Sequence, residues 1–254
     1  ASEQSGQGMT DQGGAGSAAD APMPKPPAAK FQRAWTDPLS WLPRGPEQTA
    51  RVCARPGDDP VRDAFCGAAT QSIESLADLR AALKLDSARA GRGAGQATLI
   101  NGVAVTGHST SLSARSVSTI NPRVIAVRMA IEPNDVLALA FTRSEQFAEI
   151  ASWDRVQRAL RFYVVAYKQA CNMEPNGCLP GDLLTPAAEA DWRDITLYED
   201  QDLLNTPLDC MPCHQPGGPK TPRLLRMHEL ATPWTHWFSQ DNEGGRALIE
   251  DYIA

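Results

Sequence analysis

Three residues near the C-terminal end of the chain have types and a spacing that suit metal chemistry. Cys210 and Cys213 are separated by two residues, and His214 follows the second cysteine directly. Cys-x-x-Cys-His is the signature at which c-type haem is attached. On one helical turn, this spacing puts both sulfurs beside the porphyrin edge and points the imidazole at the iron. The motif therefore predicts one covalent haem c, with His214 as the proximal iron ligand.

Two other chemistries also use a Cys-x-x-Cys pair. A structural zinc site needs a second pair of ligands, and only Cys171 and Cys178 or scattered histidines could supply it, at spacings that suit zinc poorly. A thiol–disulfide redox pair normally begins a helix directly after a strand. A random chain of this composition would contain Cys-x-x-Cys-His roughly 0.002 times, and this rarity favours haem attachment.

The other four cysteines predict two disulfide bonds. Four cysteines allow three pairings, and the local one is the simplest, with Cys53 bonded to Cys66 and Cys171 to Cys178. Each bond would close a loop that contains proline and glycine and has little packing of its own. Four free, buried thiols are the alternative. Disulfides form in oxidising compartments, and a c-type haem motif indicates the same environment.

The elements that must position the motif are predicted from hydrophobic spacing. Four short β-prone runs, separated by turn-forming residues, predict a small antiparallel meander; they are 123–129, 135–142, 147–153 and 159–167. The last run also fits a helix. Apolar residues on one helical face predict a helix over 72–83, with Ser72 as its N-cap.

Two further helices are predicted in the C-terminal part of the chain. Thr185 and Pro186 are typical of a helix start, and this helix is expected to continue through Trp192 toward Leu203. Residues 242–253 predict a second helix at the end of the chain.

Residues from about 187 to 254 resemble a small cytochrome c domain. A predicted helix precedes the motif, the Pro- and Gly-rich run 215–222 resembles the loop that follows the motif in that family, and 249–253 resembles the end of its C-terminal helix. The resemblance implies that a proline carbonyl, from Pro219 or Pro222, holds the N–H of the proximal imidazole. It covers about a quarter of the chain.

The sixth iron ligand is left open by the sequence. Met227 is the only methionine after the motif and is the first candidate, although it lies thirteen residues beyond His214, closer than in typical cytochromes c. His236, His228 and His108 are alternatives, and so is an open position. Methionine ligation would raise the reduction potential relative to two histidines.

An aromatic cluster follows these candidates. Trp234, His236, Trp237 and Phe238 lie within five residues. This cluster either forms a wall of the haem pocket, with Trp234 against the cofactor, or packs two parts of the protein together.

Composition and charge restrict the partners. The chain has 254 residues and a formal net charge of −6, without the basic patch that nucleic-acid binding requires. No apolar run is long enough to span a bilayer. Residues 1–30 are rich in Gly, Ser, Ala and Pro and predict a flexible tether, which would suit a membrane anchor through a lipidated cysteine preceding Ala1.

The predicted fold class is α+β. An N-terminal domain with a small antiparallel sheet and helices, 31–186, is expected to precede an all-α, cytochrome c-like haem domain, 187–254. The predicted function is an exported monohaem cytochrome, periplasmic or associated with the outer membrane, that passes single electrons between redox proteins. A haem-based sensor or peroxidase-like enzyme with an open distal site is one alternative. A haem-bearing subunit of a larger respiratory complex is another.

Overall fold

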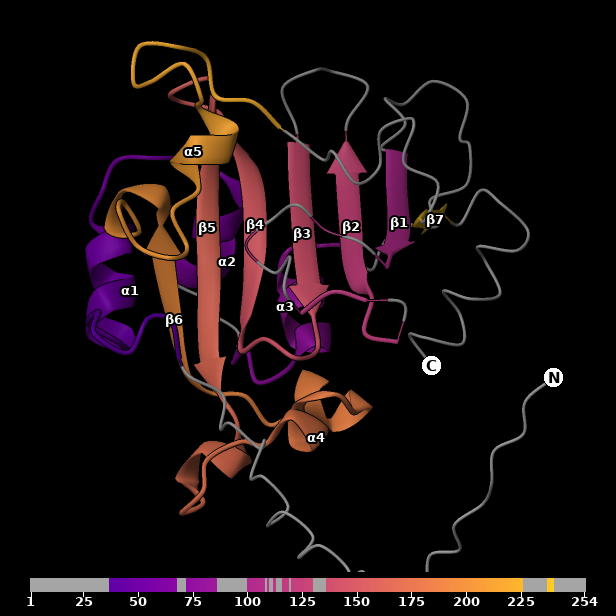
Figure 1. The fold of residues 1–254 in the computed structure, drawn as a ribbon. Coiled ribbons are helices and arrows are strands. Elements are labelled where there is room, and N and C mark those ends of the chain that lie inside the picture. Colours follow the sequence, from indigo (N-terminus) through magenta and orange to yellow (C-terminus); the bar gives the residue numbers. More distant parts are fainter. Residues whose placement is uncertain are drawn as a thin grey trace, which may run out of the picture. The chain divides into compact units, whose positions relative to one another are not determined.

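An antiparallel sheet of seven strands forms the centre of the structure (Figure 1). The computed structural model describes residues 37–67, 72–85, 100–107, 109, 112, 116–118, 120–129, 136–225 and 237–239. The strands lie in the order β6-β5-β4-β3-β2-β1-β7. Their bounds are β1 Ile100–Thr106, β2 Arg123–Met129, β3 Val136–Thr142, β4 Phe147–Asp154, β5 Ala159–Lys168, β6 Arg193–Glu199 and β7 Trp237–Ser239. β1 to β5 follow one another as neighbours, which is a meander.

The central strands are buried on both faces, and this explains their nearly continuous apolar sequence. In β5, Phe162 and Val164 point to one face of the sheet, while Tyr163 and Val165 point to the other. All four side chains are at most 3% exposed. Successive side chains of a strand alternate between faces, so a strand that is covered on both sides needs no polar alternation.

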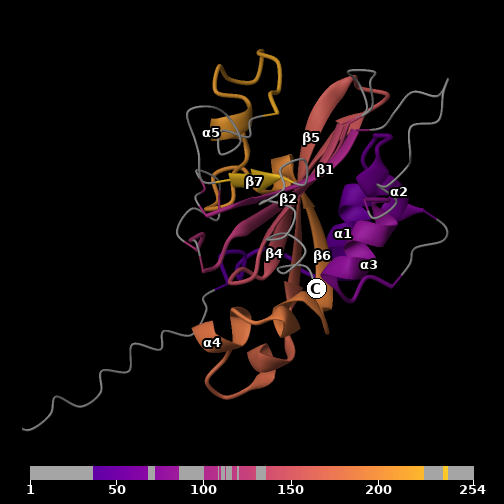
Figure 2. The same cartoon turned by 90° about the vertical axis from the view of Figure 1, so that its right-hand side faces the viewer.

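Three short helices cover one face of the sheet, as the edge-on view in Figure 2 shows. They are α1 Pro46–Cys53, α2 Pro60–Cys66 and α3 Leu76–Ala82. Each begins at a sequence signal: α1 and α2 have proline in the first turn, and the Ser75 side chain caps α3 by accepting from the Asp78 N–H at 3.0 Å. Their apolar side chains and those of the sheet form the larger core cluster.

The opposite face of the sheet carries the motif segment, and we call it the motif face. It is formed by Phe162 and Val164 of β5, Ala151 of β4 and Ala138 of β3, which belong to one buried cluster. Leu203, Leu208 and Cys210 from the segment after β6 pack into the same cluster. α5, Met211–His214, lies on this side, away from α1–α3 (Figure 2).

The remaining elements are single turns: η1 Ala170–Met173, α4 Pro180–Leu183, η2 Pro186–Glu189 and η3 Asp200–Asp202. The chain enters β6 at Trp192, whose ring stacks on Tyr167 of β5 with centroids 3.8 Å apart. No helix of the described residues is long and apolar enough to cross a membrane.

Several local predictions are confirmed. The four predicted strands are β2 to β5, and the ambiguous run at 159–167 is a strand. The helix predicted over 72–83 is present as α3, although its cap is Ser75 and not Ser72. Both local disulfides are present, Cys53–Cys66 between the last residues of α1 and α2, and Cys171–Cys178 around η1.

The predicted fold class is wrong, because the C-terminal part is not an all-α haem domain. The helix expected from Thr185 to Leu203 is replaced by η2, β6 and η3, and the motif helix α5 has only four residues. β6 pairs antiparallel with β5, with Leu197 opposite Val165 and Tyr198 opposite Val164. The physical reason is that this pairing buries the second half of β6, Thr196–Glu199, and satisfies the backbone groups along the edge that faces β5. The tether predicted at 1–30 and the helix predicted at 242–253 lie outside the described residues.

Candidate functional site

The motif cysteines and histidine lie on one helical turn, α5, near the start of β5 (Figure 1). Cys210 is the N-cap of α5, and the His214 backbone N–H donates to the Cys210 carbonyl oxygen at 3.0 Å. A helical turn places residues that are three and four positions apart on the same side. Cys213 and His214 therefore lie on the same side of the turn as Cys210, as the chemistry of haem attachment requires.

The entry to α5 is shaped by Asp209. Its carboxylate accepts from the Met211 N–H at 2.9 Å and from the Asn205 N–H at 2.8 Å. Leu203 and Leu208, at most 3% exposed, fix this stretch against the motif face. Short side chains such as aspartate satisfy the free N–H groups at a helix start, so Asp209 favours the turn and packing on the sheet holds it in place.

The exit from the motif is anchored by Arg223. Its guanidinium donates to the Asp200 carboxylate at 2.6 Å and to the Leu160 carbonyl oxygen at 2.9 Å. Asp200 is 3% exposed, and this burial raises the pKa of its carboxyl group above the usual range. The Arg223 contacts thus tie residues after the motif to β5 and to the residue that follows β6.

The two motif thiols are free, whereas the other four cysteines of the chain are paired. Cys213 is exposed and Cys210 is 7% exposed. Burial, with added repulsion from the carboxylates of Glu149 and Asp200, raises the pKa of the Cys210 thiol well above its ordinary value. Redox-active cysteine pairs instead depress a thiol pKa to form the thiolate nucleophile. This environment disfavours thiol–disulfide exchange at Cys210.

The His214 ring is held in a defined orientation. Its Nδ1 lies 2.8 Å from the Leu224 carbonyl oxygen, and the Leu224 N–H donates to the His214 carbonyl oxygen at 2.8 Å. The ring also stacks on Phe162, with centroids 4.0 Å apart and an interplanar angle of 26°. A carbonyl oxygen at Nδ1 requires the proton there, which makes Nε2 the nitrogen that carries the lone pair. Nε2 is the nitrogen through which a neutral imidazole would bind iron.

The carbonyl at the imidazole therefore comes from Leu224 and not from either candidate proline. Pro219 lies in the loop after α5, and its carbonyl oxygen is 3.4 Å from the Gln215 side-chain nitrogen. The Gln215 amide also donates to the Thr221 carbonyl oxygen at 2.7 Å, which stabilises the loop. A role for Pro219 at the cofactor stays a prediction.

A cavity of about 630 Å³ lies beside α5, but it does not include the motif side chains. Met211, Pro212 and Gln215 line it together with the loop residues Pro216, Gly218 and Pro219. Asp200, Leu204 and Asp209 also line it.

The donor set of the motif has the composition that covalent haem attachment requires. Two thiols and one imidazole with its lone pair on Nε2 match haem attachment atom for atom, and Phe162 supplies an apolar surface beside them. In the described part of the chain, no group of three or more His, Cys, Asp or Glu side chains is placed to hold a metal ion. Met227, Trp234, His228, His236 and His108 lie outside the described residues.

Comparisons with known proteins give no relationship for this chain. No protein family model matches it, and no curated protein or solved structure is significantly similar to it.

Proposed function

We propose that this protein binds one haem c covalently through Cys210 and Cys213, with His214 as the proximal ligand, and that it transfers single electrons. The observation that carries the proposal is the state of the cysteines. The two thiols of the motif are free on one helical turn, while the other four cysteines pair with each other. A bound haem supplies a ferric/ferrous couple, and the protein sets its potential and its partners.

The residues around His214 have positioning roles in this proposal. The Leu224 carbonyl fixes the proton on Nδ1, which orients the ring and makes the imidazole a stronger donor. Phe162 packs against the ring and restricts its rotation. Cys210 is buried among apolar side chains, where a thioether is as well accommodated as a thiol.

The surroundings of the motif support exchange of electrons with another protein. Cys213 is exposed and the loop after it is largely exposed, so the motif lies at the protein surface. Two disulfides agree with an exported protein in an oxidising compartment such as the periplasm. The partner is proposed to be a redox protein, free or within a respiratory complex.

Covalent attachment is tested by expressing the full chain with the c-type maturation machinery and extracting it with acid–acetone. We expect the haem to stay with the polypeptide in the wild type and to be lost when both Cys210 and Cys213 are replaced by alanine. Replacement of Cys171 and Cys178 by alanine is the matched control, because it removes two cysteines remote from the motif. Haem that is extracted from the folded wild type would contradict the proposal.

Electron transfer is tested separately by redox titration of the loaded protein. A reversible one-electron transition, with a spectrum that carbon monoxide does not change in the reduced state, supports an electron carrier. A reduced spectrum that shifts with carbon monoxide would instead indicate an open iron position and favour a sensor or enzyme.

A further inference from the structure

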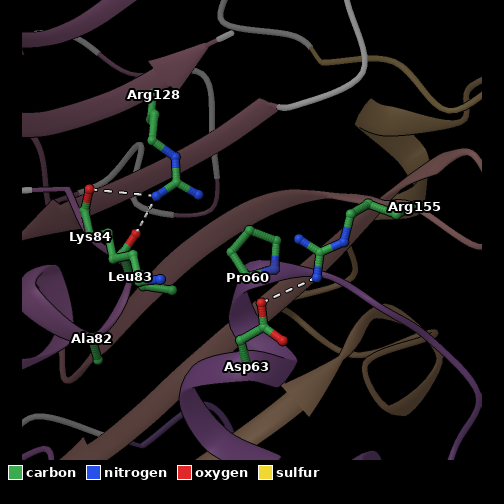
Figure 3. Close-up of a pocket in the computed structure, with 7 residues that line it drawn as sticks. All are labelled: Pro60, Asp63, Ala82, Leu83, Lys84, Arg128 and Arg155. Atoms are coloured by element: carbon green, nitrogen blue, oxygen red, sulfur yellow. Dashed lines mark hydrogen bonds and ion pairs between the residues drawn. The ribbon is translucent and has the colours of Figure 1, made fainter. Parts of the chain in front are cut away.

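A second cavity lies on the helical side of the sheet, remote from the motif (Figure 3). It has a volume of about 320 Å³ and lies among α2, the end of α3, β2 and the turn after β4. Three cationic side chains line it, Lys84, Arg128 and Arg155, with one carboxylate, Asp63. A cavity lined by an excess of one charge concentrates ions of the opposite charge.

Arg128 is the buried member of this set. Its side chain extends from β2 and is 8% exposed. Nη1 donates to the Leu83 carbonyl oxygen at 2.9 Å and lies 3.5 Å from that of Lys84. Nε is buried without a hydrogen-bond partner, and Figure 3 shows Nη2 pointing toward the space between Pro60 and Arg155.

Arg128 has no carboxylate partner among the described residues, unlike the other buried arginines of the sheet. Arg161, which is also buried, lies 2.6 Å from Asp154, and Arg123 lies 2.8 Å from Glu149. A buried charge without a counter-charge is destabilised by several kcal/mol. Backbone carbonyls solvate one edge of the guanidinium but leave its charge uncompensated.

The neighbouring groups do not neutralise Arg128. Asp63 lies 3.2 Å from Arg155, which also contacts Asp58, so the carboxylate in the cavity is engaged by the exposed arginine. The carbonyls that accept from Arg128 are presented by the end of α3, where Lys84 has a positive φ of 56°. This conformation is unfavourable for a residue other than glycine, and here it places a lysine at the cavity.

We propose that this cavity binds a small oxyanion, a phosphate or a carboxylate group, with Arg128 as its principal ligand. The guanidinium edge formed by Nε and Nη2 matches the two acceptor oxygens of such a group. The anion would supply the counter-charge that the protein does not provide. The site is independent of haem attachment, because it lies on the opposite face of the sheet.

Isothermal titration calorimetry of the full chain with inorganic phosphate, and separately with acetate, tests the site. The variants are Arg128→Met, which keeps an unbranched apolar stem and removes the guanidinium, and Arg128→Lys, which keeps the charge. Arg193→Met is the matched control, since Arg193 is an exposed arginine on β6. We expect saturable binding to the wild type and to Arg193→Met, with affinity at least about tenfold weaker in Arg128→Met.

Binding that saturates with phosphate but not acetate would assign a phosphate site, and the reverse a carboxylate site. The absence of saturable heat with either anion up to about 20 mM, or equal affinities for wild type and Arg128→Met, would overturn the proposal. If Arg128→Met fails to fold, Arg128→Lys tests the proposal instead. An ammonium cannot offer two parallel donors, so the affinity of this variant for the anion should also fall.

Discussion

Replacing Glu199 by glutamine is expected to be among the most destabilising single changes at an ionic residue of this protein. Glu199 ends β6 and is 1% exposed. Its carboxylate lies 3.2 Å from Arg55 and 3.4 Å from Arg62, and it contacts Arg161 closely. One buried carboxylate thus serves three guanidinium groups. The amide would keep the shape of the side chain while removing the charge that the three arginines share.

The size of the effect follows from the burial of the partners. Arg62 and Arg161 are 6% and 5% exposed, and removing one partner of a buried ion pair costs about 3–5 kcal/mol. The other carboxylates nearby, Asp59, Asp154 and Asp202, still pair with these arginines and keep the loss within that range. For a domain of this size, 1 kcal/mol corresponds to about 2–4 °C in Tm, so Tm should fall by roughly 6–20 °C.

The assay is guanidinium chloride and thermal unfolding of the apoprotein with its disulfides intact. Glu47→Gln is the control, because Glu47 pairs with Arg51 on an exposed surface, where the side chains are 79% and 54% exposed. Exposed pairs contribute about 0.5 kcal/mol or less. If Glu199→Gln and Glu47→Gln lose similar stability, within about 1 kcal/mol, the reasoning about the buried cluster is refuted.

Three further outcomes are expected. Replacing Cys53 and Cys66 by alanine removes a disulfide that joins residues 13 positions apart. It should lower the free energy of unfolding, measured with urea, by about 3 kcal/mol. Because the pKa of the Cys210 thiol is raised above its ordinary value of 9.0, the folded apoprotein keeps a proton that the unfolded chain releases above that pH. Stability should therefore fall as pH rises beyond 9.0, and Cys210→Ala should flatten that fall; an unchanged pH profile in the variant would contradict it. Phe162→Ala should lower the free energy of unfolding by about 3–5 kcal/mol. It should also broaden the His214 ring resonances in NMR spectra of the apoprotein, because the imidazole loses its stacking surface. His214 resonances as sharp as in the wild type would count against the positioning role.

The meander could be predicted from sequence because its signals are local. Each strand is a short run of β-branched, aromatic and small apolar residues, bounded by turn formers, and consecutive strands are neighbours in the sheet. The run at 159–167 fitted both a helix and a strand. The segment is the ten-residue strand β5, which is covered on both faces. Its backbone pairing with β4 on one edge and β6 on the other favours the strand over a helix.

The C-terminal elements could not be predicted in the same way. Thr185 and Pro186 do begin a turn, η2, but it ends at Glu189. Asp191 and Asp194 have positive φ values of 54° and 52°, which interrupt a helix. The strand that follows is specified by its pairing with β5, about thirty positions earlier. Such a partner leaves no trace in the hydrophobic spacing of the segment itself.

In the candidate site, too, the local features could be predicted from sequence and the contacts with distant residues could not. That two thiols and one imidazole share one helical turn could be predicted from the five residues of the motif. The Leu224 carbonyl at His214 could not be predicted, because any residue type presents a carbonyl and only the chain path brings it to the ring. Phe162 lies 52 positions before His214, so its stacking on the imidazole depends on the sheet.

The sheet therefore has to supply the rigidity that helices supply in a small cytochrome c domain. A four-residue helix such as α5 is too short to be stable by itself. Its flanks are held by the Arg223–Asp200 pair, 23 positions apart, and by the Arg223 contact to the Leu160 carbonyl on β5. Asp200 directly follows Glu199, so the buried arginine cluster on the helical side and the motif on the other side share one end of β6. A change that loosens this end should disturb the orientation of His214 before it unfolds the central strands, because the central strands are paired on both edges and α5 is not.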